Sequence, residues 1–269
     1  MPQRYLTETL QTFPDIAHHT APLIGVEAQM YNRLWRSIID GKLKPGMKLR
    51  EDVIGETFGI SRTLVRKVLV IMEQEGIVDL PVNHGAYVAT PTPEDAKYAV
   101  EAARLINVNA VVQLSQRDRE IHHEHLARIR QHILLQEEAE QSGEFAPIRI
   151  ISGEFLVLLV HIHGNRILAN QYENLITRLT LAAALYQRGE RKLRAGADFQ
   201  RHLLDRILAK DTTAAAEIIS NFYESVELSF KFEPRNNEVD LRTILMDDGS
   251  VPARLSRKGP RPAKRIAQN

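Results

Sequence analysis

The segment 49–89 constrains the fold of this chain most, because signals for a helix, a turn, a second helix and a hairpin follow one another closely. A short helix with acidic residues in its first turn ends at Gly59. Ser61 then offers a hydroxyl that caps a new helix, whose apolar residues recur at helical spacing. Two short β-type runs follow and are separated by a turn around Gly85. The segment therefore predicts two helices joined by a tight turn and followed by a hairpin.

Another amphipathic helix is predicted just before this segment, at 26–40, because apolar residues recur four positions apart: Met30, Leu34 and Ile38. The β-type runs of the hairpin are 77–80 and 86–89. Three helices followed by a hairpin are the pattern of a winged helix-turn-helix, whose recognition helix enters the major groove of DNA. The hairpin is then the wing.

Polar residues at the start of the third helix are the candidates for reading DNA. An arginine there either holds two acceptor atoms of guanine or grips a phosphate, and the sequence leaves both options open. Two arginines spaced four apart also occur on ordinary solvated helices, and a histidine in a turn is often a plain loop residue. The surrounding cap, buried stripe and hairpin favour DNA contact. The candidate residues are Arg50, Ser61, Arg62, Thr63, Arg66, His84 and Gly85.

Four motifs in this region together resemble the GntR family of bacterial transcription regulators. They are Gly41-x-Leu43-x-Pro45-Gly46-x-x-Leu49, Phe58-Gly59-Ile60-Ser61-Arg62-Thr63-x-Val65-Arg66, Glu75-Gly76-Ile77-Val78 and Gly85-x-x-Val88. The resemblance implies that Arg62 and Arg66 contact an operator and that the wing around Gly85 supports them. Some members also use an arginine within the second helix, where this chain has Val53. Arg50 lies three residues earlier and is expected to contact phosphate. Because the arginine of the second helix is missing at Val53, the family's operator sequences are not assumed for this chain.

Composition limits the class of protein. A chain of 269 residues with 43% hydrophobic and 26% charged residues can bury a sizeable core in two domains. We find no long uncharged apolar run and no signal-peptide pattern, so a cytoplasmic location is expected. The absence of cysteine excludes disulfides, thiolate nucleophiles and thiolate metal sites. Because the net charge is only +1, affinity for DNA has to come from local patches.

The predicted fold is mainly α, with an N-terminal winged helix-turn-helix and a C-terminal all-α helical bundle. The expected parts are an N-terminal extension outside the core fold (1–24), the DNA-binding domain (25–91), an effector-binding and dimerisation domain (94–232) and a basic, disordered tail (233–269). The end of the tail has six basic residues, three prolines and no acid, so it can add nonspecific attraction to phosphates. Six helices are predicted in the bundle, at 94–115, 118–141, 146–163, 166–188, 197–210 and 212–231.

Two patterns in the bundle resemble the FCD ligand-binding domain of FadR-type GntR regulators. They are Phe155-x-x-x-Leu159 followed by Gly164-Asn165, and Ile207-x-x-x-Asp211-x-x-x-Ala215. Many members of that group bind a divalent metal through one aspartate and three histidines. In the register that the resemblance implies, those positions fall on Ser152, Leu156, Gln200 and Phe222. Leucine and phenylalanine cannot coordinate a metal, so no metal or other cofactor is expected.

The expected pocket is apolar with a few hydrogen-bonding groups, which suits an effector with an apolar body and few polar atoms. The resemblance also implies an arginine early in the domain that meets a carboxylate of the effector; the register gives Ala103, and Arg104 is its neighbour. Arg104 could equally be a surface residue. His202 would belong to the pocket if the register is shifted by two residues. The candidate effector residues are Arg104, Ser152, Leu156, Gln200, His202 and Phe222.

The remaining histidines are interpreted as surface and loop residues, namely His122, His123, His125, His132, His161 and His163. His161 and His163 are two apart and point to different faces of a helix, so a shared metal is not expected. A metal site that uses His161, His163 or His202 in an unusual way stays open.

The sequence as a whole predicts a homodimeric transcription regulator that binds a double-stranded DNA operator and responds to a small-molecule effector, without a membrane partner. Whether it acts as a repressor or an activator stays open. An alternative is a constitutive DNA-binding dimer. In that case the bundle has a filled core, binds no effector and is only a dimerisation scaffold. An enzyme is the third hypothesis and is disfavoured, because no nucleophile–base pair, phosphate loop or metal cluster is found.

Overall fold

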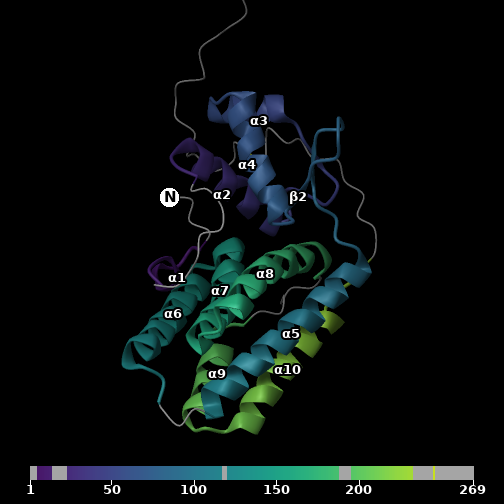
Figure 1. Cartoon of the computed structure of the whole chain (residues 1–269). Coiled ribbons are helices and arrows are strands. Elements are labelled where there is room, and N and C mark those ends of the chain that lie inside the picture. Colours follow the sequence, from purple (N-terminus) through teal and green to yellow (C-terminus); the bar gives the residue numbers. More distant parts are fainter. Residues whose placement is uncertain (1–4, 14–22, 117–119, 188–194, 233–244, 246–269) are drawn as a thin grey trace, which may run out of the picture.

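The computed structural model divides into a winged domain and a helical domain (Figure 1). It describes residues 5–13, 23–116, 120–187, 195–232 and 245. The winged domain extends from α2 to β3, and the helical domain contains α5 to α10. The expected architecture, a mainly α chain with an N-terminal winged helix-turn-helix and a C-terminal bundle, is confirmed.

The winged domain consists of three helices and a small sheet. The helices are α2 (Val26–Ile39), α3 (Glu51–Phe58) and α4 (Arg62–Gln74), and the strands are β1 (Lys48–Leu49), β2 (Val78–Asp79) and β3 (Ala86–Val88). The strands are antiparallel in the order β1-β3-β2, with Lys48 opposite Tyr87 and Val78 opposite Val88. The hairpin β2–β3 was predicted. Strand β1 was not, because two residues are too few to show a β period.

The amphipathic stripe of α2 does what its spacing predicts. Met30, Leu34 and Ile38 are fully buried, and they pack with Val68 and other apolar residues of α4 in the winged-domain core. The helix ends just before Gly41, which adopts the left-handed conformation (φ 72°).

In the described residues from 93 to 232, six helices form the helical domain, close to their predicted bounds. They are α5 (Pro93–Gln116), α6 (His123–Ser142), α7 (Phe145–His163), α8 (Arg166–Tyr186), α9 (Ala197–Leu208) and α10 (Thr212–Leu228). Side-chain caps fix two of the starts: Asn165 accepts hydrogen bonds from the first backbone amides of α8, and Asp211 accepts one from Ala214 N in α10. In the core between α5, α8 and α10, the hydroxyls of Tyr172 and Tyr223 lie 2.9 Å apart, and Asn107 donates to Tyr223.

Helix α8 contributes to the cores of both domains. Its Leu179 and Ala182 belong to the helical-domain core, whereas Leu181 and Leu185 are buried among the apolar residues of the winged domain. Near its end, the Tyr186 hydroxyl donates a hydrogen bond to the carbonyl oxygen of Pro91 in the interdomain linker. The two domains are therefore packed together and are not merely joined by a linker.

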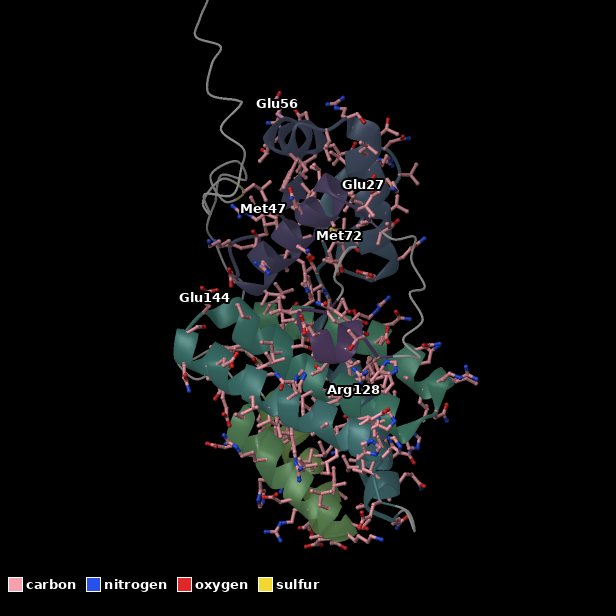
Figure 2. All side chains as sticks on the ribbon, turned by 90° about the vertical axis from the view of Figure 1, so that its left-hand side faces the viewer. Glu27, Met47, Glu56, Met72, Arg128 and Glu144 are labelled. Atoms are coloured by element: carbon pink, nitrogen blue, oxygen red, sulfur yellow. The ribbon has the colours of Figure 1, made fainter. Side chains whose placement is uncertain are left out.

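The expectation that residues 1–24 lie outside the core fold is wrong for residues 5–13 and for Leu23, which is buried in the winged-domain core. The segment 5–13 contains the short helix α1 (Glu8–Gln11), and its Tyr5, Leu10 and Phe13 are buried in the helical-domain core. Figure 1 shows α1 beside α6, although the two helices are far apart in the sequence. Figure 2 shows Arg128 of α6 close to α1. The sequence signal was weak because one turn of helix has no measurable period.

The basic tail lies outside the described residues, with the exception of Leu245. Leu245 is fully buried in the winged-domain core, and Arg33 of α2 donates to its carbonyl oxygen over 2.9 Å. The chain therefore returns to the winged domain at this residue, which the expectation of a disordered tail from residue 233 onward did not include.

Across the part of the chain that the structure describes, none of the helices combines the length and the apolar character needed to cross a membrane.

Replacing Leu181 tests the packing between the domains. Leu181 is 1% exposed, so Leu181→Ala is expected to lower the free energy of unfolding by about 2–5 kcal/mol through lost burial and a residual cavity. Leu134→Ala is the matched control, because Leu134 is half exposed on α6 and its loss is expected to cost no more than about 0.5 kcal/mol. Urea unfolding of both variants measures the difference. Equal stabilities would contradict the interdomain packing.

Candidate nucleic-acid interface and ligand cavity

A tight turn fixes α4 against α3. Gly59 ends α3 in the left-handed conformation (φ 66°), and the hydroxyl of Ser61 accepts a hydrogen bond from Leu64 N at the start of α4. Gly55, in the middle of α3, lies so close to the turn that a Cβ on it would be 2.9 Å from the carbonyl oxygen of Ile60. Gly55 was not among the predicted site residues, although a glycine within a helix often marks such a close approach.

The start of α4 presents a row of exposed side chains. Arg62, Thr63 and Arg66 are all exposed, as predicted, while the opposite side of the helix is buried in the winged-domain core. Leu64 lies among them and is 38% exposed. An exposed apolar group at this position can contact the methyl group of thymine. Sequence analysis missed it because an apolar residue at helical spacing suggests a core position.

Two ion pairs hold the arginines near the α3–α4 corner. Arg66 Nη1 lies 2.8 Å from Glu51 Oε1, which connects α4 to the start of α3, and Arg50 Nη2 lies 2.7 Å from Asp52 Oδ2. The hydrogen bond from Arg50 lowers the pKa of Asp52 to about 2. Exposed ion pairs of this kind contribute little stability, so both guanidinium groups can exchange a carboxylate for a phosphate or a base at little cost.

The wing ends in a compact turn. Asn83 and Gly85 adopt positive φ angles (60° and 87°), and His84 is exposed between them. A Cβ at Gly85 would lie 3.4 Å from Cε of Lys48, and Lys48 Nζ is 5.7 Å from the ring centre of Tyr87. The glycine thus lets a basic side chain from β1 lie along the wing. Lys48 was missed because β1 was missed.

The predicted nucleic-acid residues therefore form two groups. Four of them lie at the start of α4, with Arg50 nearby: Ser61, Arg62, Thr63 and Arg66. The other two, His84 and Gly85, lie at the tip of the wing. A guanidinium-rich helix end beside an exposed hairpin has the shape and charge to meet a groove and its flanking phosphates.

A cavity of about 60 Å³ lies between α7, α8 and α10 in the helical domain. Ser152, Leu156 and Phe222, three of the four positions of the sequence register, line it together. The buried Arg149 also lines it, and its Nη2 donates to Gln187 Oε1 over 2.6 Å. Arg149 was missed, although it lies three residues before Ser152 and therefore on the same face of α7.

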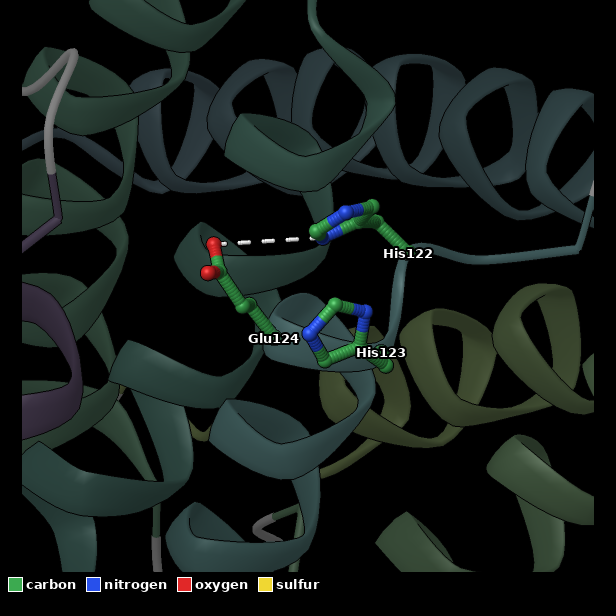
Figure 3. A group of neighbouring side chains, drawn as sticks. All are labelled: His122, His123 and Glu124. Carbon is green, nitrogen blue, oxygen red and sulfur yellow. Dashed lines mark ion pairs between the residues drawn. The ribbon is translucent and has the colours of Figure 1, made fainter.

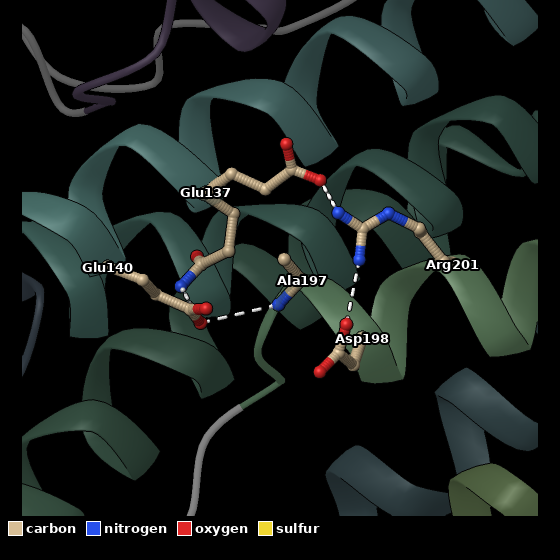
Figure 4. A network of polar contacts seen from close by, with 6 residues as sticks. Glu137, Glu140, Ala197, Asp198 and Arg201 are labelled. Carbon is tan, nitrogen blue, oxygen red and sulfur yellow. Dashed lines mark hydrogen bonds and ion pairs between the residues drawn. The ribbon is translucent and has the colours of Figure 1, made fainter.

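Polar groups connect this cavity to the start of α9. Ser152 donates to Gln136, whose amide donates to Glu140 Oε1, and the same oxygen accepts the backbone N–H of Ala197. Figure 4 shows this contact beside Arg201, which pairs with carboxylates of α6 and α9. The wall behind Ser152 is therefore tied to the neighbouring helices.

Three other predicted pocket residues lie elsewhere. Arg104 is exposed on α5, and His202 is exposed on α9, so neither lines the cavity. Gln200 is fully buried, but it donates to the carbonyl oxygen of Ala195 and is not part of the lining. The exposure of Arg104 and His202 follows from their helices, because both lie on the face away from the core.

The cavity residues do not fit the metal of the FCD group. Leu156 and Phe222 have no ligand atoms, and Gln200 does not line the cavity. One serine is left, and a divalent transition metal is not held by a single neutral hydroxyl.

The expectation that the histidines lie on the surface is wrong for two of them. His161 is buried and lies 2.7 Å from the buried Glu173, and His132 of α6 is fully buried, with its Nδ1 2.9 Å from Thr9 Oγ1 of the N-terminal segment. His122, His123 and Glu124 are exposed at the start of α6, with ligand atoms within 4.8 Å of one another (Figure 3). The positive end of the helix dipole opposes a cation there, and we assign it no role.

A second cavity, of about 450 Å³, lies between the domains. Arg178 of α8 borders it, and its guanidinium packs directly on the backbone of Gly76, where a Cβ would be 3.1 Å from Cζ. Gly76 follows the end of α4, so this contact joins the far end of the exposed helix to α8.

The geometry defines the N-terminal part as a winged helix-turn-helix. Residues 27–88 match the model of the gntR family of bacterial regulatory proteins. A Bacillus subtilis (strain 168) protein, described as the uncharacterized HTH-type transcriptional regulator YdhC, is 23% identical over 201 residues, which are 74% of this chain and 88% of that protein. The match to the gntR family model thus covers the winged domain, and the similarity to YdhC extends over most of the chain.

Solved structures share the fold at low sequence identity. A GntR transcriptional regulator from Rhodococcus sp. RHA1 matches with a TM-score of 0.62 and 20% identity, covering 75% of this chain and 95% of that one. McbR/YncC of E. coli matches with a TM-score of 0.59 and 19% identity, covering 76% and 95%. These similarities extend over both domains and concern the fold alone.

Substituting Gly55 tests the turn that positions α4. Gly55→Ala is expected to destabilise the protein by about 1–3 kcal/mol, because the new methyl group meets the carbonyl of Ile60. Gly153→Ala is the matched control: it is also within a helix, its Cβ would meet only ordinary contacts at 3.7 Å or more, and a gain of up to about 1 kcal/mol is expected. Thermal unfolding measures the stability of both variants relative to wild type. If both substitutions stabilised the protein, the turn would not be tight.

Proposed function

We propose that this protein is a sequence-specific DNA-binding transcription regulator that acts as a homodimer in the cytoplasm. The observation that carries the proposal is the exposed end of α4, where Arg62, Thr63, Leu64 and Arg66 face outward from a helix whose other side is buried. In this proposal α4 lies in the major groove and the wing, with His84 and Gly85, contacts the backbone. A dimer would place two such helices on two half-sites.

We further propose that the helical domain is of the FCD type and binds its effector in the cavity between α7, α8 and α10, without a metal. Ser152 and Arg149 supply polar groups and Leu156 and Phe222 supply apolar ones. The guanidinium of Arg149 suits a carboxylate on a small apolar body. An effector regulates only if it binds one arrangement of the dimer better than the other.

A second candidate function is a constitutive DNA-binding dimer whose helical domain is only a scaffold. The volume of the cavity favours it, since about 60 Å³ is far below the roughly 300–1,000 Å³ of sites for drug-sized ligands. Native mass spectrometry of the purified dimer distinguishes the two: a retained small molecule supports the effector, and a bare dimer that still binds its operator supports the scaffold. In neither case is the protein proposed to be an enzyme.

The DNA proposal predicts the effect of removing single arginines. Arg62→Ala and Arg66→Ala are each expected to weaken binding to an operator selected from random duplexes, by about 1–3 kcal/mol if the side chain reads a base. The melting temperature should not change, because both side chains are exposed. Arg130→Ala, an exposed arginine on α6, is the control for loss of one charge. Operator affinity equal to wild type in both variants would remove these residues from the interface.

The metal-free proposal predicts that purified protein holds no stoichiometric zinc, nickel or manganese. A chelator should change neither the melting temperature nor operator binding, because removing a metal bound only to the folded state would lower apparent stability. Elemental analysis before and after dialysis against the chelator measures this. About one metal per chain that survives dialysis would refute the assignment and direct attention to His161, His163 or His202.

A further inference from the structure

The larger of the two cavities described above lies where the winged domain meets the helical domain. Its volume of about 450 Å³ is within the roughly 300–1,000 Å³ of small-molecule sites, which occur preferentially between domains. The cavity between α7, α8 and α10 is far smaller, at about 60 Å³. The interdomain cavity therefore has the room for a small ligand that the other cavity lacks.

Both domains and the linker between them contribute to the wall of this cavity. The winged domain supplies residues at the end of α4 and on β2, the linker supplies Thr90 and Pro91, and the helical domain supplies residues of α5 and α8 (Figure 1). Pro91 is in turn held by Tyr186, whose hydroxyl donates to its carbonyl oxygen. A ligand in the cavity would contact all three parts of the chain at once.

The charged side chains of the wall carry an excess of negative charge. Among the described residues that line the cavity, three have carboxylates, and Arg178 is the single basic residue. The carboxylates come from three different elements: Glu73 from α4, Asp79 from β2 and Asp95 from α5. Three negative charges and one positive charge leave an excess of two negative charges at neutral pH, which attracts a cation and opposes an anion.

Two of the three carboxylates are held in place by hydrogen bonds. Asp95 Oδ2 accepts the backbone N–H of Thr92 over 3.0 Å and the Thr92 hydroxyl over 2.7 Å, at the start of α5. Glu73 Oε1 accepts the N–H of Leu80 over 3.2 Å. The side chain of Asp79 makes no hydrogen bond or ion pair with any other residue that the structure describes, so its carboxylate is available to a ligand.

The positive charge of Arg178 is directed toward one of these carboxylates. Its guanidinium packs on the backbone of Gly76, where a Cβ would be 3.1 Å from Cζ. The hydrogen bonds from Thr92 and, to a smaller extent, the charge of Arg178 lower the pKa of Asp95. Arg178 therefore interacts with Asp95, and the other two carboxylates of the wall have no basic residue beside them in the cavity lining.

Apolar and aromatic groups complete the wall. Val78 and Leu181 are buried where they border the cavity, and Tyr98 of α5, which also lines it, is 65% exposed. The face of an aromatic ring attracts an organic cation and also packs against an apolar group. The wall thus matches a molecule that has one ammonium group and an apolar part.

We propose that the interdomain cavity is a binding site for a small organic amine, whose ammonium group pairs with Asp79 and whose apolar part packs against Tyr98. The bound amine contacts both domains, so it holds the winged domain in the arrangement described here, because a ligand favours the arrangement that it binds best. This site is separate from the small cavity between α7, α8 and α10. Binding of the amine does not depend on the proposed DNA-binding or effector functions.

Calorimetric titration of the full chain with 2-phenylethylamine tests the site. The amine is expected to bind about tenfold more tightly than 2-phenylethanol, which has the same apolar body, because a hydrogen bond between charged groups is stronger than a neutral one. The anionic counterpart, 3-phenylpropionate, should not displace the amine. Equal affinity for the amine and the alcohol, or displacement of the amine by the acid, would overturn the assignment of a cation.

Two variants locate the bound amine. Asp79→Asn should weaken its binding about tenfold through the loss of the charged partner, and Tyr98→Leu about two- to fivefold through the loss of the aromatic face. Both side chains are exposed, so the melting temperature without the amine should not change. Asp205→Asn, the same change at an exposed residue of α9 outside the cavity, is the control. An amine affinity that neither Asp79→Asn nor Tyr98→Leu lowers would overturn the site.

Spin labels test whether the amine holds the winged domain in place. The chain has no native cysteine, and labels at Val82→Cys in the wing and Leu134→Cys on α6 occupy exposed positions. Labelled chains are diluted in unlabelled ones so that only distances within one chain are measured. Saturating 2-phenylethylamine should narrow the distance distribution, and Asp79→Asn at the same concentration should remain as broad as the amine-free protein. An unchanged distribution in a chain whose site is filled by calorimetry would overturn the hold on the winged domain.

Discussion

The packing of α8 against both domains is the constraint on which the rest of the structure depends. One helix supplies Leu179 and Ala182 to the helical core and Leu181 and Leu185 to the winged core. Residues on a third side, including Thr180 and Ala183, line the small cavity. A shift of α8 therefore cannot be confined to one domain, because well-packed side chains on every side have to follow it.

Helix α7 likewise contacts two separate groups of polar residues, one at the small cavity and one at the N-terminal segment. One face carries Ser152 and Leu156 toward the cavity, and another carries Glu154 toward the N-terminal segment. Buried polar groups are tolerated only when each one finds a partner, and α7 meets this requirement with partners from α6, α8 and the segment 5–13. The apolar residues of α7 thus pack in the core, while its few polar residues form the hydrogen bonds to the neighbouring elements.

The sequence predicted the helices well because their signals are local. Caps such as Ser61, glycines such as Gly59 and the stripe of α2 act within a few residues, and the structure has each of them. The errors concern contacts between distant residues. Nothing near Glu154 or His132 in sequence shows that the segment 5–13 will bury them, and the spacing that places Arg149 on the face of Ser152 does not show that this face borders a cavity.

The winged domain is completed by residues that lie far behind it in the sequence. Leu181 and Leu185 of α8 and, later still, Leu245 are buried in its core, although its own helices and strands end at Val88. When the winged segment leaves the ribosome, these side chains are not yet available, and their contacts have large sequence separation. Synthesis of these later residues, rather than synthesis of the helix-turn-helix itself, is then the step at which the winged domain gains its full set of core contacts.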